Sequence, residues 1–110
     1  MITMYTITEA DWKVLRKYLP QWQERYMERL CREYVALLNS EQAASDRFWA
    51  LEKRIRKDEK STGVIVDMRR SEAVNNILRL YDGGAVTLDE LSVFSEELQD
   101  FVRDYIATLS

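Results

Sequence analysis

The sequence lacks histidine and contains a single cysteine, Cys31, among its 110 residues. Without histidine the chain has neither the commonest general base nor the commonest metal ligand, and Ser-His and Cys-His nucleophile pairs are excluded. A zinc site built from thiolates needs several cysteines, and one cysteine cannot form a disulfide within the chain. We therefore predict no catalytic residues, no metal site and no cofactor, and a protein that is not an enzyme.

Turn-forming residues are also scarce, with three glycines and one proline in the whole chain. A sheet of many strands needs more turns than these residues supply, whereas a few long helices do not. The length and the 46% of hydrophobic residues suit one core. We predict a single all-α domain over residues 1–110. Because the sequence has neither a signal-peptide pattern nor an apolar run of roughly 20 residues, we expect a cytoplasmic protein that does not enter a membrane.

A heptad pattern in the middle of the chain predicts one long helix. Nine positions follow one another at alternating steps of three and four, and all but Glu41 are apolar: Met27, Leu30, Tyr34, Leu37, Glu41, Ala44, Phe48, Leu51 and Ile55. The pattern predicts a continuous helix from about Pro20 to about Lys57, roughly 57 Å long. A compact chain of this size is only about 34 Å across. We therefore expect the apolar positions to form a self-association seam, and the protein to be a homodimer.

Three to four helices are expected in all, with the long helix at the centre. Thr8 and Asp11 resemble a capping box, so a first helix is expected to begin at Thr8 and to break near Pro20. Residues 58–63 are expected to be a connector, with Gly63 in a left-handed turn. A third helix is predicted over residues 67–81. A fourth is predicted from Leu88, with a second possible cap at Ser95, and together they form a C-terminal helical hairpin.

Charge is unevenly distributed along the chain. Residues 1–46 carry a net charge of -1, residues 47–70 carry +4 and residues 71–110 carry -6. The candidate partner-binding cations in the basic segment are Arg54, Arg56, Lys57, Arg69 and Arg70. They can contact an acidic protein surface or phosphates, but cations near the end of a helix can also simply complement its dipole. The net charge of -3 favours a protein partner over nucleic acid.

Three aromatic residues lie off the seam and are further candidates for partner binding: Trp22, Tyr26 and Trp49. Tryptophan and tyrosine are enriched at the energetic centres of interfaces. Packing inside the protein is the other interpretation, which we favour for Trp22, while the two are balanced for Trp49.

The chain resembles a group of small, uncharacterised helical proteins from Gram-positive bacteria and their phages and mobile elements. The similar runs are residues 18–29 (YLPQWQERYMER), 62–70 (TGVIVDMRR) and 84–97 (GAVTLDELSVFSEE). Some members are labelled multidrug transporters, which the absence of an apolar run contradicts. The resemblance implies a small regulator or a stoichiometric inhibitor, for example of a host defence system such as CRISPR. The alternative is a dimeric nucleic-acid-binding regulator that uses residues 53–70.

Overall fold

The computed structural model describes residues 5–109, and these residues form helices but no strands, as the sequence predicts. The four α-helices are α1 (Glu9–Leu38), α2 (Ala44–Asp58), α3 (Ala73–Asp82) and α4 (Glu96–Leu109), with two short 3₁₀ helices, η1 (Arg70–Glu72) and η2 (Asp89–Val93). None of the described helices is long and apolar enough to cross a membrane.

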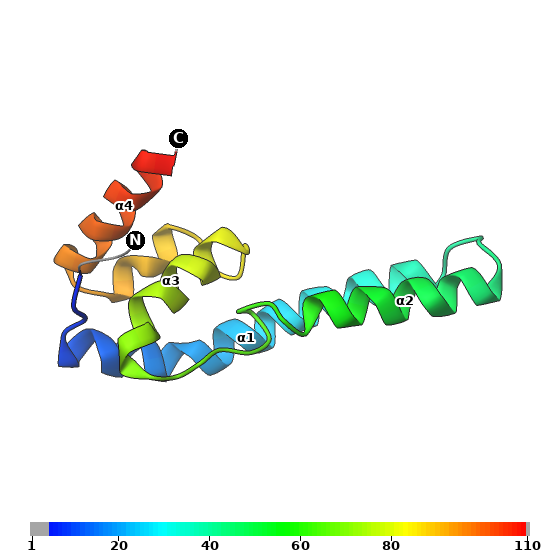
Figure 1. Cartoon of the computed structure of the whole chain (residues 1–110), viewed down its shortest axis with the longest axis horizontal. Helices are drawn as coiled ribbons and strands as arrows, with labels where there is room; N and C mark the ends of the chain where they lie inside the picture. The colour runs from blue at the N-terminus through cyan, green and yellow to red at the C-terminus, as the bar shows by residue number, and fades with distance from the viewer. Residues whose placement is uncertain (1–4, 110) are drawn as a thin grey trace.

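A long helix is present, but the predicted bounds of about 20 to 57 are wrong. Helix α1 begins at Glu9 and ends at Leu38, the chain reverses over residues 39–43, and α2 returns antiparallel beside α1 (Figure 1). The heptad pattern did not reveal this turn, because the same spacing is found in two structures. It places apolar residues along one side of a continuous helix, or on the facing sides of the two helices of a hairpin. The length argument for a partner chain therefore fails, and any case for one must come from exposed surface.

The start of α1 is where the sequence predicts it, whereas the expected break at Pro20 does not occur. The side chain of Thr8 caps the helix by accepting from the backbone N–H of Asp11 at 3.2 Å. Pro20 lies inside α1. Both Pro20 and Arg16, whose carbonyl loses its helical donor, are exposed on the helix surface. Solvent access there explains how the helix tolerates the proline.

The hydrophobic core lies at one end of the molecule, between the first half of α1 and the C-terminal elements α3, η2 and α4 (Figure 1). Its large buried side chains are Ile7, Leu15, Leu19, Trp22, Val74, Ile77, Leu78, Leu80, Val86, Leu91, Phe94, Leu98 and Val102. We call residues 5–26 and 63–109 the head.

The C-terminal elements differ in detail from the predicted helices. Asn76 donates to the carbonyl of Asp67 at 2.8 Å, and residues 65–69 have no regular secondary structure before η1 and α3. The capping box of Thr87 and Glu90 forms, but it opens the 3₁₀ helix η2 and not an α-helix. Ser95 then caps α4, since its hydroxyl accepts from the N–H of Leu98 at 3.3 Å.

The second half of α1 and all of α2 project from the head as a two-helix arm, residues 27–58 (Figure 1). The molecule measures 51 × 30 × 23 Å, and its radius of gyration is 16.6 Å. A compact chain of this length has a radius of gyration near 13 Å. The arm accounts for the difference, and only Leu30 and Asp58 within it are buried.

Candidate protein-binding site

The base of the arm is fixed by a buried carboxylate, Asp58, at the end of α2. The hydroxyl of Tyr34 donates to Asp58 Oδ2 at 2.6 Å, and Arg54 Nε donates to the same oxygen at 2.9 Å. Arg54 also pairs with Glu33 of α1. Burial and the hydrogen bond to Asp58 raise the pKa of Tyr34 to about 12, so the phenol stays protonated at neutral pH. These contacts tie α2 to α1 where the arm meets the head.

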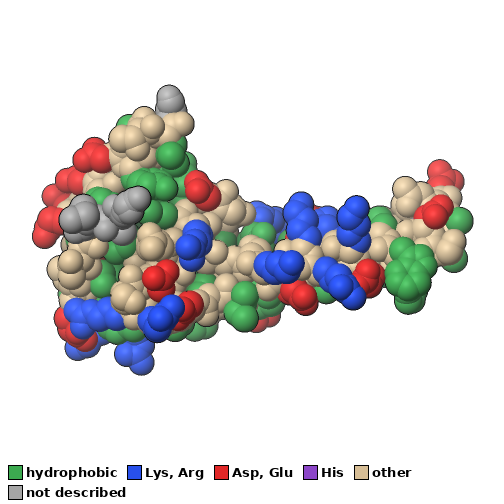
Figure 2. Space-filling model, viewed as in Figure 1, with side chains coloured by type: hydrophobic (Ala, Val, Ile, Leu, Met, Phe, Trp, Pro, Cys, Tyr) green, Lys and Arg blue, Asp and Glu red, His purple; other side chains and the backbone are tan. Residues whose placement is uncertain are grey.

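The arm exposes large apolar side chains from near its tip to its base, which we call the arm patch. It consists of Val35 and Leu38 on α1, exposed by 57% and 41%, and Phe48, Trp49 and Ile55 on α2, exposed by 62%, 63% and 41%. The rings of Phe48 and Trp49 meet edge to face with centroids 4.9 Å apart. Figure 2 shows hydrophobic side chains gathered along the arm near its tip.

The two helices contribute to this patch along a shared edge. On α1, Cys31, Val35 and Leu38 are spaced by four and three residues and so lie on one helix face. Cys31 and Ile55 line the same shallow pocket of about 170 Å³, together with Met27 and Leu30. Exposed apolar residues of α1 therefore lie close to those of α2.

The predicted self-association seam is closed within the chain along part of its length. Leu30 is buried, and Met27, Tyr34, Leu37 and Leu51 are half-buried between α1 and α2. Phe48 and Ile55 remain exposed and belong to the arm patch. The seam is thus chiefly an internal contact of the hairpin, and only its outer members are available to a partner.

The three aromatic candidates differ in how far they are exposed to solvent. Trp22 is only 4% exposed and stacks on Tyr18 in the head, so it is not available to a partner and its assignment to the binding site is wrong. Tyr26 is half-buried, and its hydroxyl accepts from Ser61 at 3.2 Å. Its ring packs against Gly63, which leaves no room for a larger residue there. Trp49 is the one of the three that faces solvent.

Gly63 differs from its predicted role. Gly84 is the only residue with positive φ among those described, so Gly63 does not form the left-handed turn expected from the sequence. Because Gly63 has no side chain beside Tyr26, residues 61–63 can approach α1 closely.

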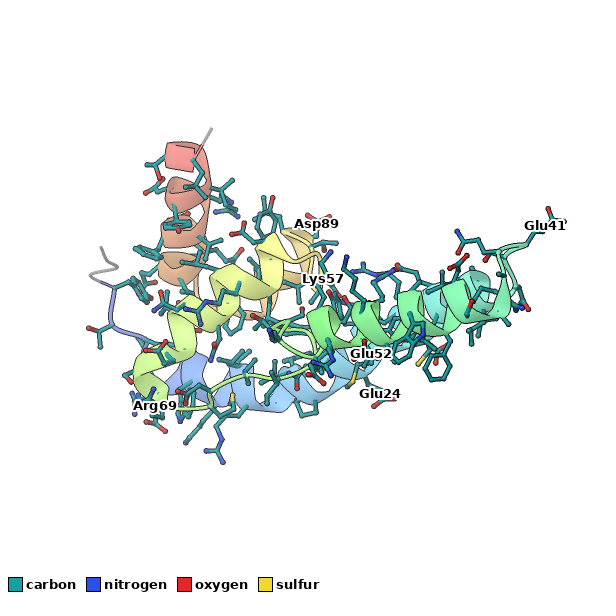
Figure 3. All side chains as sticks on the ribbon, turned by 45° about the vertical axis from the view of Figure 1, so that its right-hand side comes forward. Glu24, Glu41, Glu52, Lys57, Arg69 and Asp89 are labelled. Carbon is teal, nitrogen blue, oxygen red and sulfur yellow. The ribbon has the colours of Figure 1, made fainter. Side chains whose placement is uncertain are left out.

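The basic segment does not form one surface. Figure 3 shows Lys57 at the base of the arm and Arg69 at the opposite end of the head. Four of its eight cations already have acidic partners: Arg54 pairs with Glu33 and Asp58, Arg56 with Glu52, Arg69 with Asp67, and Arg70 with Glu9. The structure therefore does not bring these predicted site residues together.

The head has a groove of about 370 Å³ between α1 and η2, lined by Tyr18, Trp22, Arg25 and Glu90 among others. Arg25 donates to Glu90 at 2.9 Å and to the carbonyl of Ala85 at 2.7 Å. The hydrogen bond from Arg25 lowers the pKa of Glu90, which is therefore a poor proton donor at neutral pH. Within residues 5–109, no three potential metal ligands of the acid, cysteine or histidine type cluster together.

Val35, Leu38 and Asp58 are the site residues that the sequence did not single out. Cys31, Val35 and Leu38 are spaced by four and three residues and form a second apolar stripe beside the seam. This spacing was the feature of the sequence from which Val35 and Leu38 could have been identified. Asp58 gave none, since an acid in a charged connector is normally solvated. Comparisons with protein-family models, curated proteins and solved structures found no match.

Proposed function

We propose that this chain is a non-enzymatic protein-binding module whose contact surface is the arm patch, and that its first partner is a second copy of itself. The observation that supports this is the exposure of Phe48 and Trp49 on an arm with little core of its own. Monomeric proteins rarely leave a contiguous apolar patch larger than a few hundred Å² in water.

The size of the patch fits a specific interface. From their exposed fractions, the five side chains present roughly 500 Å² per copy, or roughly 1,000 Å² for two copies, which is about the minimum for a biological interface. Trp49 and Phe48 are the expected energetic centre, because aromatic side chains bury much area at low entropic cost. Their edge-to-face contact holds them in a defined shape.

Charge on the arm favours an antiparallel neighbour. The tip carries Glu41 and Asp46, while the last turns of α2 carry Lys53 and Lys57. Figure 3 shows Glu41 at the outer end and Lys57 at the base. When two arms lie antiparallel, the acidic tip of one meets the basic base of the other.

A small regulator or stoichiometric inhibitor is the biological role that we propose for such a module. It acts by covering a surface of a larger protein, in the way that the resemblance to proteins of phages and mobile elements implies. This role needs no chemistry from the chain, and the arm offers an exposed aromatic surface for it.

The test is the double variant Phe48→Ser, Trp49→Ser, compared with the unchanged chain by light scattering at micromolar concentration. Leu109→Ser is the matched control, because Leu109 is exposed by 61% but lies at the end of α4, away from the arm. We expect the double variant to lose self-association and keep its helical circular dichroism, and the control to change neither. An equal loss in the control would contradict the proposal. A salt-dependent shift of DNA in a gel would favour the nucleic-acid alternative instead.

A further inference from the structure

The turn of the arm begins with two common turn residues, Asn39 and Ser40, but has few other features that stabilise it. Residues 39–43 read NSEQA, without glycine or proline, and none of them has positive φ. Ala43 occupies the N-cap of α2 and has no side-chain oxygen to accept from the helix. Ser40 Oγ is buried without a hydrogen-bond partner. The closed turn therefore carries an unsatisfied polar group and an uncapped helix start.

The heptad spacing, by contrast, passes through this turn without interruption. Leu37, Glu41, Ala44 and Phe48 follow at steps of four, three and four. Glu41, Gln42 and Ala43, the last three residues of the turn, are all good helix formers, whereas Asn39 and Ser40 before them are weaker ones. A helix continued through residues 39–43 would place the inner faces of α1 and α2 on one stripe, as a coiled-coil strand has them.

Two contacts across the arm share one centre in the sequence, while the Tyr34–Asp58 contact is centred at residue 46. The pairs Tyr26–Ser61 and Glu33–Arg54 are both centred between Ala43 and Ala44. If the arm opens into one helix and lies antiparallel to a second opened copy, each of these contacts can form again between the two chains. Two small alanines then meet at the centre, where helices can approach closely.

We infer that the arm opens at residues 39–43 and exchanges α2 with a second copy of the chain, giving a swapped dimer of two long antiparallel helices. This inference rests on the proposed self-association and specifies its form. Leu38 and Phe48 flank the turn on either side, so the exchange brings the exposed parts of both arm patches together at the centre of the dimer. Apart from the contacts within and across residues 39–43 and those between the two arm patches, the closed and exchanged forms contain the same contacts.

Arg47 is the group that favours the closed form. Its guanidinium donates to the carbonyl of Leu38 at 2.7 Å and to that of Gln42 at 3.0 Å, across the turn. In a continuous helix the carbonyl of Leu38 accepts instead from the N–H of Gln42, and Arg47 has no role there. The loss of Arg47 should therefore shift the equilibrium toward exchange.

The experiment uses Cys31, the only cysteine of the chain, and the substitution Glu59→Cys. Both positions line the same small pocket at the base of the arm. A short bismaleimide links them within one chain in the closed arm and between chains in the swapped dimer. Mixing ¹⁵N-labelled and unlabelled protein before linking, after a cycle of unfolding and refolding, identifies links between chains by mass spectrometry.

Two further substitutions, added to the Glu59→Cys chain, should shift the equilibrium between the closed and exchanged forms in opposite directions. A third serves as the control. Ala43→Pro suits the observed φ of -58°, whereas in a continuous helix it removes the hydrogen bond to the carbonyl of Asn39, so links between chains should be largely lost. Arg47→Gln should raise the interchain fraction severalfold, while Arg56→Gln, which removes an ion pair within α2, should leave it unchanged. Circular dichroism checks that each variant is folded.

The outcomes separate the two proposals. Links between chains in the unchanged arm, lost in Ala43→Pro, support the exchange. A dimer linked only within each chain overturns the exchange and leaves self-association standing. A protein that stays monomeric and is linked only within its own chain overturns both the exchange of α2 and the proposed self-association.

Discussion

The hydroxyl of Tyr34 on α1 donates to the buried carboxylate of Asp58 at the end of α2, at 2.6 Å. This contact joins the two helices of the arm at the point where the arm leaves the head. Asp58 is only 7% exposed, so its charge depends on Tyr34 and Arg54 for its hydrogen bonds.

The substitution Tyr34→Phe should lower the free energy of unfolding by about 1.5 to 3 kcal/mol, the usual worth of a hydrogen bond to a charged group. The phenylalanine ring fills the same space between the helices, so the change isolates the hydroxyl. Urea titration followed by circular dichroism measures the difference. An unchanged urea midpoint would mean that water hydrogen-bonds to Asp58 as well as Tyr34 does.

The same contact makes a prediction for alkaline pH. Because burial and the bond to Asp58 raise the pKa of Tyr34 from its ordinary 10.0 to about 12, the folded chain holds the phenol proton more tightly than the unfolded chain. This contribution is complete below pH 10 and disappears as the pH rises through about 12. The difference in stability between wild type and Tyr34→Phe should therefore shrink over that interval.

A second prediction concerns Asp11, a buried acid in the first turn of α1. It accepts from the N–H of Ser95 at 2.8 Å and from its hydroxyl at 2.6 Å, so it positions the start of α4. Asp11→Ala should destabilise the head by about 2 to 3 kcal/mol, since both donors lose their partner. Glu9→Ala is the control, as it removes an exposed acid from the same turn. Equal effects would show that only helix charge matters.

A third prediction concerns the approach of Gly63 to Tyr26. A methyl group at residue 63 would overlap the Tyr26 ring, so Gly63→Ala should cost about 1 to 3 kcal/mol through overpacking. Tyr26→Ala in addition removes the overlap. The double variant should then be more stable than the sum of the single changes indicates, and strict additivity in this double-mutant cycle would contradict the contact.

A fourth prediction separates the inner and outer seam positions. Leu37→Asp places a charge in the half-buried contact between the helices and should lower the melting temperature of the protein. Phe48→Asp changes a side chain that is 62% exposed, so it should leave melting nearly unchanged and abolish self-association. Thermal circular dichroism and light scattering on both variants distinguish these effects, and equal melting losses would place Phe48 in a core.

Capping side chains predicted where helices begin, although the helix after Thr87 is a 3₁₀ helix and the break expected at Pro20 does not occur. Thr8 and the Thr87–Glu90 pair form their expected caps, and α3 ends at Asp82 before the two glycines. The reversal at residues 39–43 has no such signal, because the hairpin and the continuous helix satisfy the same apolar spacing. Trp49 and Phe48 could be identified as candidates, but their exposure, and the burial of Trp22 against Tyr18 and Phe94, are set by tertiary packing that the spacing does not show.

Sedimentation equilibrium of the unchanged chain, from about 1 µM upward, tests most directly whether the arm patch binds a second copy, since an interface of roughly 1,000 Å² lies in the weak, transient class and the range must extend to high concentration. We expect the average mass to rise from that of the 13.1 kDa chain toward twice that value, and Trp49→Ser to suppress the rise. A mass that stays at 13.1 kDa up to about 1 mM, where even weak specific contacts are populated, would contradict self-association through the arm.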